Sequence, residues 1–560
     1  MSDVVSVNAL ADRFWAGILD LSPLWATLLG DESSADRWDD PTAAGRDAEA
    51  ALVASVLKDA AAIDPVGIDV EERITLDIVR LVARMRQRAA ELDLWHFEAV
   101  DQMAGPQTLP GELARLQRVD SPERIERLLS RLAAYPALID GHIANLGEGL
   151  RAGRTAPVIA VERTIAQVRR MVDGPIEDAP LLVAHPELGA ADRERIAVAL
   201  RTHVQPALVR FLDTLVAYQP GARPGDGVCW LPDGEDVYRY LILHNTSLDD
   251  DARTIHDYGL ARITEIRAEM QAIAEQLGHA DIAALRAALA IDPANHVTDP
   301  ADMVGLATDQ IARTTAVAPR WFGRLPASAV EVRAVEPHQE RDAPPAFYIQ
   351  PSPDGARPGI YFINTYDPAS RPLHRLASTT FHEAVPGHHF QIALEAEHGT
   401  LPAFRRFAAR IVGGAYVEGW GLYSERLADE MGLYADATER FGMLEAQAWR
   451  AARLVVDTGL HAFRWERSQS VALLQEAAGL SLLEAETETD RYITWPGQAL
   501  CYMTGQRVIE GLRHDLEARD GDRFDLRAFH DEVLGHGSLP LSTLRAELPA
   551  WVQPRDVATV

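Results

Sequence analysis

The chain has 560 residues, with 54 basic and 83 acidic side chains and a formal net charge of −29. Such a protein is a poor partner for nucleic acid or for an anionic membrane surface, because both attract basic residues. Hydrophobic residues make up 47% of the chain and charged residues 24%, as in globular proteins with a sizeable core. The two cysteines, Cys229 and Cys501, lie far apart in sequence. Neither a disulfide framework nor a cysteine-based metal site is therefore expected.

The N-terminal stretch Met1–Gly30 carries acidic residues early and lacks the basic start of a signal peptide. Its apolar residues have the spacing of an amphipathic helix. The sequence contains no apolar run long enough to span a bilayer. We therefore expect a cytoplasmic protein.

Most of the chain has apolar residues three and four positions apart, which is the period of an α-helix with one buried face. The clearest expected helices are Val70–Trp95, Ser121–Leu150, Ala190–Tyr218, Asp249–Leu277 and Ala301–Thr315. Ser121 and Pro122 form a typical helix start, a cap followed by a proline in the first turn. These amphipathic runs predict a mainly α fold, a large helical bundle.

The character of the sequence changes near residue 326. Two short β-rich runs, Ala346–Gln350 and Gly359–Asn364, are connected through the turn residues Pro353, Asp354 and Gly355 and predict a small β-hairpin. We divide the chain into an N-terminal helical region, 1–325, and a catalytic helical region with the hairpin, 326–560, as parts of one integrated module. The run Gly359–Asn364 could act as an edge strand that aligns an extended peptide.

The stretch TTFHEAVPGHHFQ begins like a zinc-peptidase helix, with His382 followed by Glu383. Pro386 stands where the second histidine of His-Glu-x-x-His belongs. On an unbroken helix His388 and His389 would lie roughly 9 and 10 Å along the axis from His382, too far to share one ion. Pro386 lacks an N–H group and clashes with the carbonyl of His382, so it should break the helix.

Gly387 then permits a sharp turn that could bring a late histidine back to His382. The alternative is a plain helix end with a histidine pair in its cap. A second helical segment, Ala415–Gly432, favours the metal site, because Glu418 lies there among Tyr416, Trp420 and glycines and unlike an acid on a solvated face. Glu425 lies two turns further on nearly the same face, where a salt-bridged surface role and a supporting role are both open.

Five segments together resemble the bacterial domain of unknown function 885 family, in matching order and over most of the chain. They are HEAVPGHHFQ (382–391), YVEGWGLYSE (416–425), DTGLHAFRW (457–465), WPGQALCYMTG (495–505) and FHDEVLGHGSLPL (529–541). This family is similar to helical zinc metallopeptidases of the gluzincin kind, including the thimet-oligopeptidase-like and carboxypeptidase Taq groups. The resemblance implies a mainly α-helical fold with a deep active-site groove and one zinc ion at its floor.

The resemblance also implies roles for individual residues. His382 and His388 look like the imidazole ligands, Glu418 like the third ligand and Glu383 like the general base. His389 is the fallback for His388. The expected oxyanion donors are Tyr502 and His461, the latter oriented by Asp457 one helical turn away. The remaining candidates for substrate contacts or for support of the ligands are Tyr492, Gln498, Arg491, Glu425, Tyr416 and His530. Tyr502, His461 and Tyr492 could each instead be a buried side chain that satisfies a core hydrogen bond.

The sequence thus predicts a zinc hydrolase that cleaves peptide or amide bonds in small peptides or amide-linked metabolites. One alternative is an amidase or esterase of a specific metabolite, because the same machinery serves both bonds. Another is a metal- or ligand-binding protein without turnover, which Glu383 beside His382 speaks against. The third is a helical scaffold without metal. We expect neither nucleic acid nor a membrane as partner, and the sequence predicts no oligomeric state.

Overall fold

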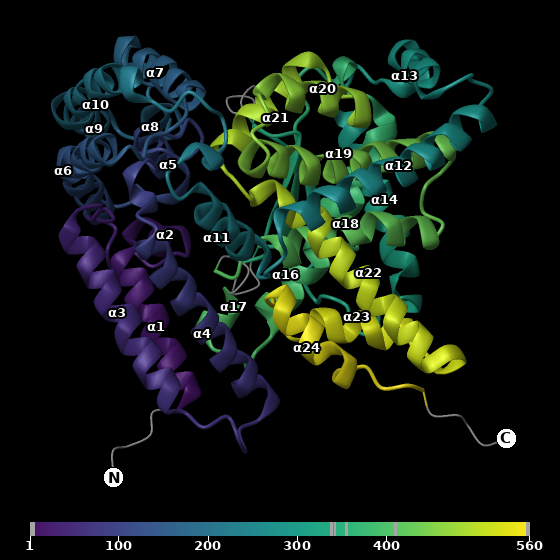
Figure 1. The fold of residues 1–560 in the computed structure, drawn as a ribbon. Helices are drawn as coiled ribbons and strands as arrows, with labels where there is room; N and C mark the ends of the chain where they lie inside the picture. The colour runs from purple at the N-terminus through teal and green to yellow at the C-terminus, as the bar shows by residue number, and fades with distance from the viewer. Residues whose placement is uncertain (1–5, 337–339, 341–342, 353–356, 408–410, 556–560) are drawn as a thin grey trace. The chain divides into compact units, whose positions relative to one another are not determined.

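A computed structural model of the chain describes residues 6–336, 340, 343–352, 357–407 and 411–555 (Figure 1). The chain divides into two compact units. Unit 1 comprises Met1–Tyr240, Leu460–Arg467 and Asp490–Pro496, and unit 2 comprises Leu241–Gly459, Ser468–Thr489 and Gly497–Val560. The first division along the chain falls near residue 240, whereas the sequence analysis places its boundary at 325.

Helices dominate both units, which confirms the predicted mainly α fold. Those of unit 1 are α1 (Val7–Leu21), α2 (Pro23–Leu28), α3 (Ala43–Ala62), α4 (Val70–Glu91), α5 (Leu109–Leu116), α6 (Pro122–Ala152), α7 (Val158–Asp173), α8 (Pro180–Val183), α9 (Ala190–Ala199) and α10 (Gln205–Tyr218). Helices α1, α3 and α4 pack on one another, and α6, α7 and α10 form a second group (Figure 1). The core of the second group includes Leu132 and Tyr135 of α6 and Phe211 of α10.

The predicted helices occur with small differences at their ends. Helix α6 begins as expected, with Ser121 as cap, its hydroxyl accepting a hydrogen bond from the N–H of Arg124 at 3.3 Å. The expected helix Ala190–Tyr218 is α9 and α10 joined by one π-helical segment, Leu200–Val204. Helix α11 (Gly234–Thr246) contributes residues to both units.

Unit 2 contains the segments that were singled out for metal binding. Its helices are α12 (Ala252–Gln276), α13 (Ile282–Ile291), α14 (Pro300–Val317), α15 (Leu376–Glu383), α16 (His388–Glu397), α17 (Ala403–Arg406), α18 (Ala415–Glu430), α22 (Cys501–Asp520), α23 (Leu526–Gly535) and α24 (Leu541–Trp551). Besides α11, three helices contribute residues to both units, α19 (Ala437–Ala462), α20 (Arg467–Ala478) and α21 (Leu482–Thr494).

Helices α18 and α22 form the centre of unit 2, and their backbones touch. A Cβ atom on Gly419 would lie 2.4 Å from the Cα of Gly505, and a Cβ atom on Gly505 would lie 1.9 Å from the carbonyl oxygen of Ala415. Glycine is therefore required on both helices at this crossing. Helices α15 and α16 pack on α18, which brings the HEAVPGHH and YVEGWG segments together.

A small sheet packs against α14 and α15 and has the strand order β1-β3-β2. Strands β2 (Ala346–Ile349) and β3 (Gly359–Ile363) pair antiparallel, which confirms the predicted hairpin. Strand β1 (Val330–Ala334), which the sequence analysis missed, pairs parallel to β3. The turn residues Pro353, Asp354 and Gly355 lie outside the described residues. Because β3 is the central strand, the hypothesis that it is an edge for peptide alignment is wrong; the edges are β1 and β2.

Within the described part of the chain, every helix is too short or too polar to cross a bilayer.

Candidate metal centre

The helix is interrupted between His382 and His388, as Pro386 and Gly387 predict. Helix α15 ends at Glu383 and α16 begins at His388. In between, Ala384 and Gly387 leave the helical region, with ψ of −104° and −125°. A Cβ atom on Gly387 would lie 1.9 Å from the carbonyl oxygen of His382, so only glycine lets the connection fold back this closely.

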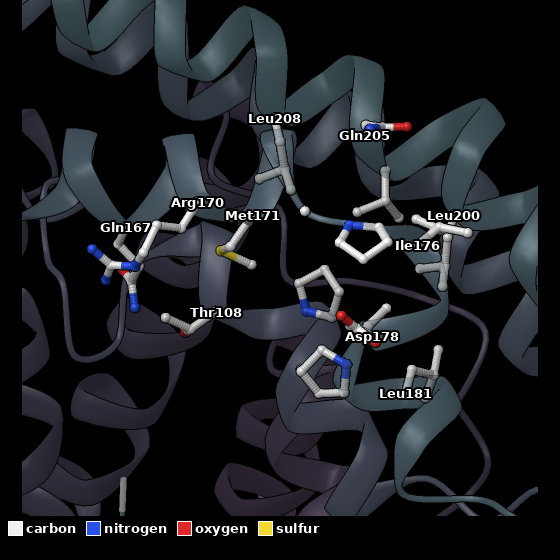
Figure 2. Close-up of a pocket in the computed structure, with 17 residues that line it drawn as sticks. Thr108, Gln167, Arg170, Met171, Ile176, Asp178, Leu181, Leu200, Gln205 and Leu208 are labelled. Carbon is white, nitrogen blue, oxygen red and sulfur yellow. The ribbon is translucent and has the colours of Figure 1, made fainter. Parts of the chain in front are cut away.

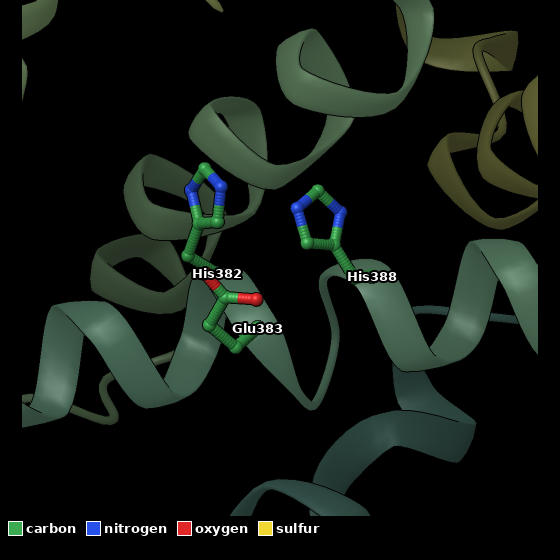
Figure 3. A group of neighbouring side chains, drawn as sticks. All are labelled: His382, Glu383 and His388. Atoms are coloured by element: carbon green, nitrogen blue, oxygen red, sulfur yellow. The ribbon is translucent and has the colours of Figure 1, made fainter. Parts of the chain in front are cut away.

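The fold-back brings the imidazoles of His382 and His388 face to edge, with ring centres 4.7 Å apart and planes at 81° (Figure 3). Figure 3 shows the Glu383 carboxylate directed toward the space between the two rings. One ligand-type atom from each of His382, Glu383 and His388 lies within 4.8 Å of the others. The break thus does what an unbroken helix cannot, which is to bring His388 beside His382.

Glu418 of α18 completes the group. Its Oε2 lies 3.3 Å from Nε2 of His382 and 3.6 Å from Nε2 of His388. Donors that share a tetrahedral zinc ion at bond lengths of about 2.0–2.1 Å are separated by roughly 3.3–3.4 Å. The two separations from Glu418 Oε2 are therefore close to those of ligands that share one zinc ion.

The charges of the site match its geometry. Burial alone would lower the pKa of the His382 imidazole, but the carboxylates of Glu418 and Glu425 raise that pKa to about 9. Burial would raise the pKa of Glu418, yet the imidazoles of His382 and His388 hold it well below its usual value. The positive charge of a proton on His382 is thus stabilised by the carboxylates on both sides of its ring.

Glu425 holds the first imidazole from behind. Its Oε1 lies 2.9 Å from Nδ1 of His382, and Gln447 of α19 donates to its other oxygen at 3.3 Å. The Glu425 side chain is 1% exposed, so it is not a surface acid. A carboxylate on Nδ1 directs the Nε2 lone pair toward Glu418 and His388.

Helix α18 shapes the space around the histidines with small and large residues. A Cβ atom on Gly421 would lie 2.7 Å from the ring of His382, so glycine leaves room for the imidazole. The indole N–H of Trp420 donates to the carbonyl of Pro386 at 2.9 Å and holds the fold-back against α18. The aromatic and glycine setting of Glu418 has a physical reason: it accommodates α15, the connection and α22.

Comparison with protein families shows which family the chain belongs to. Residues 23–548 match the family described as bacterial protein of unknown function, DUF885. The chain belongs to this family. No curated protein matches it. Among solved structures, the DUF885 chain is similar to a candidate lipoprotein from Colwellia psychrerythraea, with 27% identity, a TM-score of 0.89 and coverage of 98% of this chain and 99% of that one. A candidate lipoprotein of unknown function from Shewanella oneidensis shares the fold at 20% identity, with a TM-score of 0.78 and coverage of 97% and 99%.

The structure of this DUF885 protein removes His389 as the fallback ligand. Its Nδ1 lies 2.9 Å from the hydroxyl of Tyr348 in β2, and its Nε2 lies 3.0 Å from the carbonyl oxygen of Ser328. Both ring nitrogens are thus engaged, and burial lowers the pKa of His389 to about 4. His389 fixes the sheet to α16, and His388 is the histidine that faces His382.

His461 is likewise corrected. This imidazole, in unit 1, is fully buried; its Nδ1 accepts from the N–H of Val228 at 3.1 Å and its Nε2 donates to the carbonyl of Tyr492 at 3.0 Å. With both nitrogens bound to backbone it has no lone pair or proton for a substrate. Asp457 binds the N–H of Gly497 at 3.1 Å with both carboxylate oxygens, so it anchors the start of the WPGQALCYMTG segment.

The other predicted residues divide between structural positions and the metal centre. The buried Tyr416 donates its hydroxyl to the carbonyl of Val533. His530, also buried, contacts the hydroxyl of Tyr423 and the carbonyl of Trp321, both at 2.9 Å, and burial lowers its pKa to about 3. Both side chains are buried, and these hydrogen bonds go to groups other than the proposed metal ligands.

Tyr502 is the predicted substrate-contacting residue that the structure places at the metal centre. Its ring stacks on that of His382, with centres 6.3 Å apart and planes at 27°. Gln498 opens a short 3-10 turn directly before α22. Arg491 belongs to unit 1, with its guanidinium 5.8 Å from the ring centre of Tyr492 and 5.9 Å from that of Trp495.

Unit 1 contains a separate pocket of about 520 Å³ (Figure 2). Its wall is largely apolar, with Met171, Leu200 and Leu208 among the lining residues and Arg170 and Asp178 as charged groups. None of the residues predicted for metal or substrate binding lines it.

The sequence analysis also missed Gln447, which lies on no recognised motif and could only have been found by its helical spacing on α19.

Proposed function

We propose that this protein is a zinc-dependent hydrolase of amide or peptide bonds, with His382, His388 and Glu418 as metal ligands. The observation that carries the proposal is the position of Glu418 Oε2, 3.3 and 3.6 Å from the two imidazole nitrogens. The buried Glu425 behind His382 adds support, because a carboxylate on the far nitrogen is usual for ligating histidines. We also propose that the protein is similar to gluzincin-type helical peptidases, whose zinc ligands are a pair of histidines and a glutamate from a second helix.

Each residue near the centre has a distinct role in the proposal. When bound, the zinc ion would lower the pKa of a water in its open position and polarise the substrate carbonyl. Glu383 would take the proton from the attacking water and deliver it to the leaving nitrogen. Its carboxylate is directed into the space between the histidines, whereas Glu418 makes the closer approach to both rings. The Tyr502 hydroxyl would donate a hydrogen bond to the developing oxyanion.

Metal analysis tests the ligand set. Purified wild type, His382→Ala, His388→Ala, Glu418→Ala and His389→Ala proteins are compared for bound zinc by mass spectrometry after dialysis against zinc-free buffer. We expect wild type and His389→Ala to hold about one equivalent and the other three to lose it. Full zinc in His388→Ala or Glu418→Ala would contradict the proposed site.

Turnover is tested separately, with a screen of small peptides and acylated amino acids. We expect Glu383→Gln to retain zinc and to lose hydrolysis of any substrate that the wild type cleaves. Glu397→Gln is a matched control, because Glu397 ends α16 and binds the backbone N–H groups of Ala327 and Ser328. An active Glu383→Gln variant would refute the assignment of the base.

A further inference from the structure

Arg450 of α19 stands out among the cations of unit 2. Within the described part of the chain, no carboxylate lies within ion-pair distance of its guanidinium, and its buried Nε has no hydrogen-bond partner. The one hydrogen bond from its Nη1, to the carbonyl of Ala446, is long at 3.5 Å. The side chain is partly buried. A partly buried guanidinium without an anionic partner is uncommon in a protein with a net charge of −29.

The next arginine on the same helix is a useful contrast. Arg453 lies one turn further on, is 3% exposed and forms an ion pair with Glu488 at 3.0 Å. Its guanidinium lies 4.5 Å from the ring centres of both Trp449 and Tyr502. Arg453 is thus paired and held in place, while Arg450 has the same aromatic neighbours at 4.8 and 5.7 Å and no anion.

These aromatic contacts connect Arg450 to the metal centre. Its Cζ lies 5.7 Å from the ring centre of Tyr502, and the Tyr502 ring stacks on His382. The Tyr502 ring thus lies between Arg450 and His382, one of the proposed ligands. The two contacts place the Cζ of Arg450 no more than about 12 Å from the ring centre of His382. An extended chain adds roughly 3.5 Å per residue, so a carboxylate one or two residues from a carbonyl at the candidate metal centre falls within this limit.

We propose that Arg450 binds the free carboxylate of the substrate, one or two residues beyond the scissile bond. The substrate class is then a short peptide or N-acyl amino acid with a free carboxyl end. The planar guanidinium offers paired N–H donors that match a carboxylate, and its stacking on Trp449 and Tyr502 limits its freedom. This inference rests on the proposed function for the identity of the scissile bond, but the carboxylate site itself can be measured without hydrolysis.

The experiment compares two probes that differ only in charge, N-benzoylglycylglycine and N-benzoylglycylglycinamide. Their binding is measured by calorimetry to zinc-loaded Glu383→Gln protein, in which hydrolysis is blocked. We expect the acid to bind at least about tenfold more tightly than the amide, as a charge-assisted hydrogen-bonded pair implies. Adding Arg450→Gln should reduce this preference to about threefold or less, and Arg450→Lys should restore part of it.

Arg440→Gln is the matched control, because this substitution removes the same charge from the same helix. Arg440 forms an ion pair with Asp429 at 2.8 Å. It should leave the preference unchanged. Equal binding of the two probes, no binding of the acid, or a preference that survives Arg450→Gln would overturn the inference. If the wild type cleaves amides but does not prefer the acid, the proposed hydrolase function stands and the carboxylate site at Arg450 is contradicted. If the acid binds in an Arg450-dependent way but no substrate is cleaved, the carboxylate site stands and the proposed hydrolase function is contradicted.

Discussion

Glu425 and His382 are joined by a contact of 2.9 Å between Oε1 and Nδ1, and both side chains are almost fully buried. The contact places a carboxylate behind the imidazole, two helical turns from Glu418 on α18. One helix therefore supplies both the carboxylate that faces the imidazole nitrogen Nε2 and the one that fixes its orientation.

Glu425→Gln should lower zinc affinity about 10- to 100-fold, because the amide is a weaker acceptor for the Nδ1 proton. Competition with a zinc-binding dye measures the affinity. Glu430→Gln removes a carboxylate from the same helix that pairs with Arg513 at 2.8 Å, and it should have no effect. Unchanged affinity in Glu425→Gln would reduce that residue to a packing role.

Zinc affinity should depend on pH through His382. Its pKa is raised to about 9 in the metal-free protein, so zinc must displace a proton below that pH. The apparent affinity should rise about tenfold per pH unit up to about pH 9 and then level off. Because the folded-state pKa is raised, the metal-free protein has its full stabilisation from this proton below about pH 6.5 and loses it as pH rises toward 9. Affinity that is flat between about pH 6 and 9 would contradict the raised pKa.

Gly387→Ala should disrupt the fold-back. The added Cβ would lie 1.9 Å from the carbonyl oxygen of His382, so the connection must shift and His388 with it. We expect a loss of roughly 1–3 kcal/mol in the free energy of unfolding, together with weaker zinc binding. Thermal unfolding and zinc titration measure the two effects. Gly399→Ala is the control, since a Cβ there meets no atom within 4 Å.

His461→Gln should affect stability and not chemistry. The substitution disturbs hydrogen bonds to the backbone of Val228 and Tyr492, each worth about 1–3 kcal/mol when a buried partner is left unsatisfied. The midpoint of thermal unfolding should fall, while the folded fraction keeps its kcat and its zinc. A large loss of kcat at unchanged stability would return His461 to the catalytic candidates.

Tyr502→Phe should lower kcat about 10²- to 10³-fold with little change in KM or zinc content, as expected for a donor used in the transition state. Steady-state kinetics on a substrate found by the screen measure this. The stacking of the ring on His382 is retained by phenylalanine, so the variant isolates the hydroxyl. Equal kcat in wild type and variant would leave the oxyanion without a tyrosine donor.

The sequence was informative wherever local chemistry decides the structure. The hydrophobic period located the main helices, and Pro386 with Gly387 indicated the break between α15 and α16, because their backbone limits act within one turn. The hairpin followed from its β-rich runs. The sequence did not predict strand β1, because its pairing partner is distant in the chain. The first residue of β1, Val330, pairs with Gly359, 29 residues later.

Side-chain partners were much harder to predict than elements. His389, His461 and His530 all lie in segments that resemble the family, as His382 and His388 do. Their ring nitrogens are bound by groups distant in the chain, such as Ser328, Val228 and Trp321. Only the fold distinguishes them from His388. For the same reason the sequence leaves the role of Glu425 open and gives no indication of a role for Arg450.

The crossing of α18 and α22 at Gly419 and Gly505 bears on how variation can enter this protein. Glu418 lies on α18 and Tyr502 lies on α22, and the two helices meet here through backbone atoms. The spacing between the Glu418 carboxylate and the Tyr502 hydroxyl is therefore not set by a side chain that could adjust. A single methyl group at Gly505 would act as a wedge and displace both at once. The contacts of Arg450 on α19 with the rings of Trp449 and Tyr502 are made by side chains, so a substitution there need not move either helix of the crossing.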